Sequence, residues 1–254
     1  MLQTIPELGK FIVFEGLDCS FKETNSNKLY EYIKENHPEI NVKSVHFPRY
    51  GEPACCMVEK YLGAGIKNNI VLTSFMKSLP FLFDMVDYFV SEGIEHLRNK
   101  GWIIADRYWY SNIFYRGAEN CPTIEDEYVM NLMLRTSMYN IFDDLKKMAD
   151  KMMLPSPDFV FLMKSHFRTV KEKLESKETN LDEHTKNLDY IKNVMKCYDL
   201  FNFMGIVDYD NIPVYDKLYI PDDPNSSYEV KIKSEEEIFN HIKEIFESKV
   251  MING

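Results

Sequence analysis

Short apolar runs alternate with longer stretches of helical periodicity along this chain, and the alternation constrains the fold more than any other feature. The apolar runs predict buried strands at residues 10–16, 40–47, 101–106, 158–163 and 204–210. The periodic stretches predict helices at residues 25–36, 72–99, 167–176, 183–203 and 234–248. Strands that alternate with helices favour an open parallel sheet with helices on both faces. We therefore predict an α/β protein with three α/β/α layers around a central parallel five-stranded sheet.

The length of 254 residues suits one large domain, which we expect to span residues 1–254. Residues 119–154 carry a helical pattern rich in methionine, which predicts an extra helical hairpin with a pliable apolar face. Pro80 is expected to interrupt the longest helical pattern. Ser234 and Glu237 form an S-x-x-E capping box, which predicts the start of the last helix.

The chain is acidic, and this charge limits the partners that it can bind. It contains 40 acidic and 30 basic residues, for a formal net charge of −10. Such a surface argues against binding nucleic acid through phosphate contacts but permits a small anionic ligand at a locally basic site. Its five cysteines include no C-x-x-C pair, and no apolar stretch approaches the roughly 20 residues that span a bilayer. We expect a cytoplasmic protein that binds neither nucleic acid nor membranes.

The segment "FEGLDCSFKET" follows the first predicted strand and is similar to a phosphate-binding loop. That loop has the pattern G-x-x-x-x-G-K-[ST] between a strand and a helix. Gly16 and Lys22 have the required spacing, but Phe21 replaces the second glycine and Glu23 replaces the hydroxyl residue. The candidate phosphate-binding residues are Gly16, Leu17, Asp18, Cys19, Ser20, Phe21, Lys22, Glu23 and Thr24.

Basic side chains follow three of the predicted strands. Lys22 follows the first strand, Arg49 the second and Arg107 the third. The carboxyl ends of parallel strands meet at one edge of a sheet, where ligands of such folds bind. An acidic chain that collects cations at this edge is suited to anions, and phosphoryl transfer requires mainly positioning and charge stabilisation.

Five segments, in this order along the chain, resemble the motifs of thymidylate kinases, a family of P-loop nucleoside monophosphate kinases. They are "FIVFEGLD", "HFPRYG", "LPFLFDMVD", "IIADRYWYSNIFYRGA" and "LPSPDFVFLM". The resemblance covers residues 9–118 well and residues 154–210 loosely. It implies a P-loop kinase fold with ATP as phosphoryl donor, Mg²⁺ as cofactor and nucleotides as small-molecule partners. It also implies a homodimer and a lid at residues 168–186.

The resemblance assigns roles to individual residues. Lys22 and the loop backbone would hold the phosphates of ATP, and Asp18 would lie near the acceptor nucleotide. Lys22, Asp18, Arg107 and Arg49 would form the catalytic group. Asp106 would help to hold the magnesium ion, and a carboxylate at Glu23 is a second candidate ligand, since Mg²⁺ prefers oxygen.

The acceptor nucleotide would be held by a second set of residues. The resemblance implies that Arg49 and Arg107 bind the acceptor's phosphate, because the arginine fork suits phosphate oxygens. Phe83 would stack on the base. Ser111 and Tyr115 would lie nearby.

Four departures from the family pattern affect this assignment. Phe21 lies where the loop has a glycine, and we expect it to fit only with an ordinary backbone and a ring that points away. Glu23 lies where a hydroxyl residue is expected. Asp87 and Glu183 lie where the family carries arginines near the acceptor and in the lid.

Three functions remain open from the sequence. The first is a dTMP kinase that forms dTDP and ADP for dTTP synthesis, or a kinase of another nucleoside monophosphate. The second is a non-catalytic nucleotide-binding homologue of such a kinase. The third is a deoxynucleoside kinase that phosphorylates a sugar hydroxyl, against which the acceptor-phosphate Arg49 argues.

Overall fold

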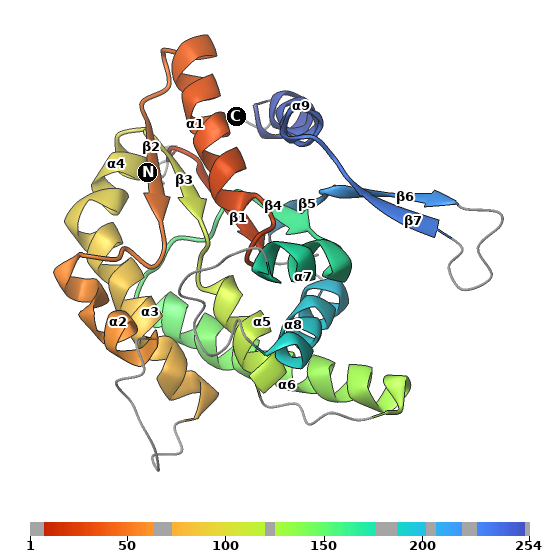
Figure 1. The fold of residues 1–254 in the computed structure, drawn as a ribbon. Helices are drawn as coiled ribbons and strands as arrows, with labels where there is room; N and C mark the ends of the chain where they lie inside the picture. Colours follow the sequence, from red (N-terminus) through yellow and green to blue (C-terminus); the bar gives the residue numbers. More distant parts are fainter. Residues whose placement is uncertain are drawn as a thin grey trace, which may run out of the picture.

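The computed structural model describes residues 8–62, 73–119, 125–175, 187–201, 207–219 and 228–251, and Figure 1 shows them arranged around a central sheet. The strands of this sheet are β1 (Phe11–Gly16), β2 (Val42–His46), β3 (Trp102–Asp106), β4 (Phe159–Lys164) and β5 (Asp208–Pro213). Their order across the sheet is β2-β3-β1-β4-β5. Every neighbouring pair is parallel, so the prediction of a parallel five-stranded sheet is confirmed.

Helices connect the strands and pack on both faces of the sheet (Figure 1). They are α1 (Lys22–Asn36), α2 (Cys56–Leu62), α3 (Ser74–Tyr88), α4 (Ile94–Arg98), α5 (Tyr110–Glu119), α6 (Glu127–Lys151), α7 (Phe167–Glu175), α8 (Leu188–Leu200) and α9 (Glu235–Ile245). A 3₁₀ turn at Pro53–Cys55 and π-helical segments at Phe89–Gly93 and Phe246–Val250 complete the helical elements of the described residues.

The strands of the sheet bury both of their faces, so two hydrophobic cores form. Along β1, Phe11 and Val13 face one core, whereas Ile12 and Phe14 face the other. Helices α1 and α9 cover the second core, and α3, α5, α6 and α8 cover the first. Full burial of one such side chain contributes roughly 1.5–3 kcal/mol. The two cores give the predicted three layers.

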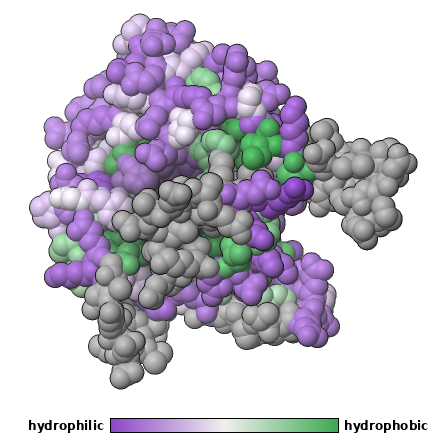
Figure 2. Space-filling model, viewed as in Figure 1, coloured by the Kyte–Doolittle hydropathy of each residue, from purple (hydrophilic) through white to green (hydrophobic). Residues whose placement is uncertain are grey.

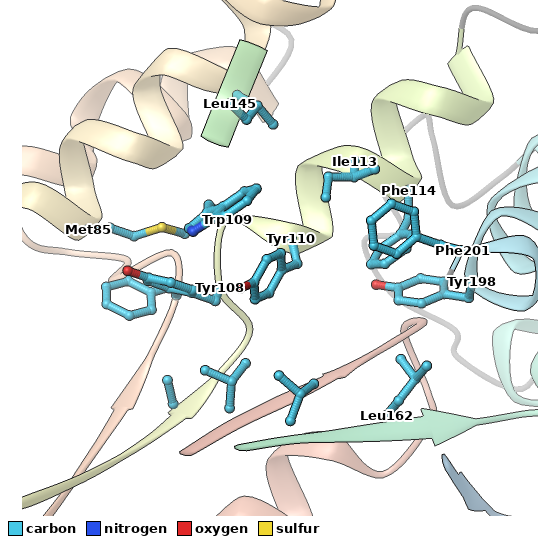
Figure 3. Packing of buried hydrophobic residues seen from close by; sticks show 14 of the residues in the cluster. Met85, Tyr108, Trp109, Tyr110, Ile113, Phe114, Leu145, Leu162, Tyr198 and Phe201 are labelled. Carbon is cyan, nitrogen blue, oxygen red and sulfur yellow. The ribbon is translucent and has the colours of Figure 1, made fainter. Parts of the chain in front are cut away.

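An aromatic layer joins α5 and α8 to the sheet beside the end of β1. Figure 3 shows Phe114 on α5 face to face with Tyr198 on α8, and their ring centroids lie 3.9 Å apart. Tyr108 and Tyr110 lie between α5 and the sheet and are buried to within 2% exposure. These rings fix the turn between β3 and α5, which carries Arg107.

Two predictions about the strands need correction. The fifth strand begins at Asp208 and ends at Pro213, later than the predicted residues 204–210, of which 204–206 lie outside the described residues. An antiparallel pair, β6 (Tyr215–Tyr219) and β7 (Tyr228–Ile232), then precedes α9. The polar sequence at residues 219–229 is typical of a surface loop. Its first and last residues instead belong to these strands, and 220–227 lie outside the described part.

The helix predictions also change in two places. The chain remains helical through Pro80, although a proline there removes one backbone hydrogen bond. Ser78 and Leu82 on either side are fully buried, and this packing stabilises the helix. The described part of the predicted hairpin at residues 119–154 holds one long helix, α6, with Leu134 and Leu145 fully buried against the core, and residues 120–124 lie outside the described residues. The predicted Ser234 capping box of α9 is confirmed.

The visible face of the molecule is mostly hydrophilic, with hydrophobic side chains in small groups (Figure 2). Within the described ranges, no helix is both long enough and apolar enough to cross a membrane.

Candidate active site

The loop between β1 and α1 lies at the carboxyl edge of the sheet, next to the ends of β3 and β4. Gly16 ends β1 with a φ of 150°. A Cβ atom at this position would lie 2.7 Å from the Met163 carbonyl oxygen and 2.8 Å from Ser20 Oγ. The glycine is therefore required by a close approach of the backbone.

The backbone of this loop is left-handed at two residues with side chains. Cys19 has a φ of 66° and Phe21 a φ of 63°. The expectation of an ordinary backbone at Phe21 is therefore wrong, because the residue adopts the conformation that a loop glycine adopts without strain, at a cost of roughly 1–2 kcal/mol. Its ring packs against the core between α1 and the sheet, as expected for a side chain that points away from the loop. Phe21 thus keeps the loop shape and offsets part of the strain by packing.

Lys22 begins α1 and lies across the loop. Its Nζ donates a hydrogen bond to the Leu17 carbonyl oxygen at 2.8 Å, and the residue is 6% exposed. Burial lowers the pKa of Lys22, and the charge of Arg107 lowers it further, while Asp18 and Asp106 oppose these effects. In the same loop, Ser20 Oγ is buried and contacts no hydrogen-bond partner within the described residues. The loop therefore holds an ammonium group and a spare hydroxyl.

Arg107 follows β3 and joins the end of this strand to the loop. The backbone at Arg107 has a φ of 69°. The side-chain Nη2 forms an ion pair with Asp18 Oδ1. Nη1 donates to Ser111 Oγ at 3.4 Å, and the guanidinium lies 5.6 Å from the ring centroid of Tyr115. The hydroxyl of Tyr115 in turn donates a hydrogen bond to Asp18 Oδ2 at 3.1 Å. Asp18, Arg107, Ser111 and Tyr115 therefore form one connected group.

Asp18 is ionised in this group. Burial alone would raise its pKa, but the positive charges of Arg107 and Lys22 outweigh that effect and lower the pKa of Asp18 to about 2. The side chain is still 45% exposed, so solvent screens these charges.

Asp106 is the last residue of β3, and its two carboxylate oxygens differ in their hydrogen bonding. Oδ2 lies 3.1 Å from His46 Nδ1, whereas Oδ1 is buried and has no hydrogen-bond partner among the residues described. Burial opposes ionisation, but the hydrogen bond with His46 and the charges of Lys22 and Arg107 lower the pKa of Asp106. An ionised, unsatisfied oxygen beside Lys22 suits a hard cation.

Glu23, the second predicted metal ligand, is exposed in the first turn of α1. Within the described residues, no three His, Cys, Asp or Glu side chains converge in a way that could hold a metal ion. A metal in this site would therefore depend on few protein ligands and on oxygens of the bound phosphates or water.

Glu15 is a site residue that the sequence reasoning did not select. Its Oε1 accepts hydrogen bonds from the backbone N–H of Tyr108 at 2.9 Å and of Ser111 at 3.2 Å. Its Oε2 accepts from Ser111 Oγ at 2.7 Å and Tyr198 Oη at 3.4 Å. Burial raises the pKa of Glu15 to about 7, although the Ser111 hydrogen bond and nearby Arg107 and Lys22 lower it. A carboxyl group within an otherwise apolar strand is the signal that could have found it.

Arg49 lies in a separate cluster, in the loop after β2. Its Nε donates to Asp84 Oδ1 at 2.9 Å, and its Nη2 donates to Asp87 Oδ2 at 2.6 Å. Phe83, on the same helix α3, is 53% exposed. Arg49 thus contacts two carboxylates of α3, and the sequence did not predict these contacts. Most of the predicted lid, residues 176–186, lies outside the described residues.

The fold and this loop together define an α/β protein of the P-loop kinase type. Residues 14–132 match the family model described as thymidylate kinase. The chain is 38% identical to a thymidylate kinase of Plasmodium falciparum over 108 residues, which are 42% of this chain and 48% of the relative. It is 25% identical to a thymidylate kinase of Brachyspira hyodysenteriae over 202 residues, 76% of this chain and 81% of that relative. The chain therefore matches about half the length of the Plasmodium relative and most of the bacterial one.

Solved structures have the same fold. A thymidylate kinase structure from Candida albicans superposes with a TM-score of 0.62 at 20% identity, covering 95% of this chain and 92% of that one. The chain is therefore similar to thymidylate kinases, over residues 14–132 in the family model and over a longer stretch in the bacterial relative. Its loop departs from the usual phosphate-binding pattern at Phe21 and Glu23.

Proposed function

We propose that this protein is a dTMP kinase, which transfers the γ-phosphoryl group of ATP to dTMP and forms dTDP and ADP for dTTP synthesis. The observation that carries the proposal is the group of Lys22, Arg107, Asp18 and Asp106 at one edge of the sheet. Two cations next to an ionised carboxylate suit the charge that spreads over phosphoryl oxygens during transfer. The names of the relatives support the same activity.

The loop residues bind and orient the donor in this proposal. Lys22 holds the phosphates of ATP with its ammonium group, and Ser20 adds a buried hydroxyl. The backbone N–H groups of residues 17–24 complete the cradle at the start of α1, where the helix dipole favours anions. Glu23 adds a negative charge at this end of the helix, which we expect to weaken binding when no metal is present.

Asp106 holds Mg²⁺ in this proposal, together with phosphate oxygens and water. Its buried Oδ1 lacks a partner among the described residues, so a bound cation would satisfy it. When bound, Mg²⁺ neutralises charge on the phosphoryl oxygens. Glu23 remains a second proposed ligand.

The acceptor side rests on Arg49, Arg107, Phe83, Ser111 and Tyr115. Arg107 binds the acceptor's phosphate, and its ion pair with Asp18 holds the guanidinium toward the loop. Phe83 stacks on the base with its half-exposed ring. Within the proposed single domain, residues 119–154 are an insertion, and residues 168–186 are the proposed lid, of which 176–186 lie outside the described residues.

The proposal is tested by ADP release, measured with dTMP, dUMP and thymidine as acceptors. The wild-type protein is compared with Lys22→Ala and with Lys34→Ala, an exposed lysine on the same helix α1. We expect turnover with dTMP and none with thymidine, and loss of turnover in Lys22→Ala alone. An absence of turnover with every acceptor, in a protein that binds ATP, would refute the proposed kinase activity.

We also propose a homodimer. Tyr128, Leu132 and Tyr139 on α6 are 77%, 54% and 55% exposed, and their spacing places them along one side of the helix. A second copy would remove this apolar stripe from water. Light scattering should give twice the monomer mass for the wild type and the monomer mass for Leu132→Glu.

The compartment that we propose is the cytoplasm. The free thiols of Cys55 and Cys56 support it, since thiols persist in reducing compartments.

A further inference from the structure

Two carboxylates of α3 hold Arg49, and they differ sharply in burial. The Asp84 side chain is 1% exposed, whereas that of Asp87 is 53% exposed. Asp84 accepts two hydrogen bonds, from the backbone N–H of Arg49 at 2.9 Å and from its Nε at 2.9 Å. Asp87 accepts one, from Nη2 at 2.6 Å. Asp84 therefore fixes both the loop and the side chain of Arg49, whereas Asp87 contacts only the outer end of the guanidinium.

The contact with Asp87 uses a donor that an anionic ligand would need. Arginine binds phosphate through two parallel N–H groups of its planar fork. Nε of Arg49 is taken by Asp84, and Nη2 is shared between the Asp84 carbonyl oxygen at 3.0 Å and the Asp87 carboxylate. Nη1 makes no hydrogen bond within the described part of the chain. A fork of Nη1 and Nη2 can therefore grip a phosphate only if Asp87 releases Nη2.

The two carboxylates differ in how easily a ligand can replace them at Arg49. An exposed ion pair such as that of Asp87 contributes at most about 1 kcal/mol, so it can be exchanged for a ligand. The buried Asp84 cannot be exchanged, because its removal leaves donors of Arg49 unsatisfied. In addition, two carboxylates around one guanidinium make this part of the acceptor side repel an incoming dianion.

We propose that Asp84 and Asp87 act oppositely on the acceptor's phosphate. Asp84 is a positioning residue that holds Arg49 ready, and Asp87 is a competitor that occupies Arg49 until the phosphate replaces it. This inference rests on the proposed function, because it takes Arg49 as a ligand of the acceptor's phosphate. It makes Asp87 a determinant of how strongly the protein binds phosphorylated acceptors.

The test measures dTMP binding by calorimetry in the wild type and in Asp87→Asn, Asp84→Asn and Glu95→Gln. Glu95 is exposed on the neighbouring helix α4, so its variant changes the net charge equally without touching Arg49. Asp87→Asn should bind dTMP about fivefold more tightly, the factor that corresponds to about 1 kcal/mol. Asp84→Asn should bind at least fivefold more weakly, because asparagine offers one acceptor oxygen where two donors of Arg49 point. Glu95→Gln should match the wild type.

Thymidine, which lacks the phosphate, provides the second arm, and its binding should not change in any variant. In turnover experiments, Asp87→Asn should lower KM for dTMP more than it changes kcat. The inference is overturned if Asp87→Asn binds dTMP as weakly as the wild type or not at all, or if Glu95→Gln tightens binding equally. If Asp84→Asn does not fold, dTMP binding by Asp87→Asn still tests the inference. If the variants bind dTMP as expected but the wild type shows no turnover, the inference is supported and the proposed kinase activity is refuted.

Discussion

Replacing Glu15 with glutamine should change how the stability of this protein depends on pH. Burial raises the pKa of Glu15 to about 7 in the folded protein, from an ordinary value of 4.5. Between these two values the folded protein holds a proton that the unfolded chain has lost. Stability therefore falls as pH rises through this window, by about 3 kcal/mol in total. Below the window, both states are protonated and the term is constant.

Glutamine removes this titration but keeps the shape of the side chain. Its oxygen can accept from the backbone N–H groups of Tyr108 and Ser111. Its amide can donate to the hydroxyls of Ser111 and Tyr198, because a hydroxyl also accepts. We therefore expect Glu15→Gln to match the wild type near pH 4, below the window, and to exceed its stability by up to about 3 kcal/mol at pH 8.

Urea unfolding followed by tryptophan fluorescence at pH 4, 5, 6, 7 and 8 measures this difference. Glu35→Gln, which changes an exposed glutamate on α1, is the matched control and should show no such trend. A difference between Glu15→Gln and the wild type that is the same at every pH would refute the assigned protonation of Glu15. So would an equal trend in the control.

Other substitutions test separate parts of the site and fold. Lys22→Ala should lower kcat by about 10²-fold or more, since a lost charge contact costs about 3 kcal/mol in the transition state, and steady-state kinetics would show this. Phe21→Gly should be about 1 kcal/mol more stable than Phe21→Ala in urea, because only glycine relieves the left-handed backbone; equal stabilities would contradict the strain. Asp106→Asn should raise the Mg²⁺ concentration for half-maximal rate, and an unchanged titration would exclude it as a ligand. Ser234→Ala should cost about 1 kcal/mol in thermal or urea unfolding by removing the cap of α9.

The central sheet and the edge that collects Lys22 and Arg107 could be predicted because they depend on local pattern and chain order. Apolar runs that alternate with helices specify parallel strands, and parallel strands bring the residues that follow them to one edge. Lys22 and Arg107 are therefore found where the sequence places them. The contact between Asp18 and Arg107 follows from the same geometry.

The remaining features depend on packing that the sequence pattern does not encode. Asp84 and Arg49 are 35 residues apart in the chain, and their contact depends on the approach of α3 to the loop after β2. The left-handed backbone of Phe21 contradicts its residue type and is stabilised by the tertiary contact of its ring. The proton on Glu15 depends on complete burial, which a strand pattern predicts, and on partners from α5 and α8, which it does not.

Transfer of a labelled phosphoryl group tests the central claim most directly. The protein would be incubated with Mg²⁺, dTMP and ATP labelled in its γ-phosphoryl group, and the products would be separated by chromatography. The proposed function predicts that the label appears in dTDP, in equal amount to the ADP formed, and that Lys22→Ala forms both at least about 10²-fold more slowly. Label that appears only in inorganic phosphate, or that remains in ATP, would contradict it.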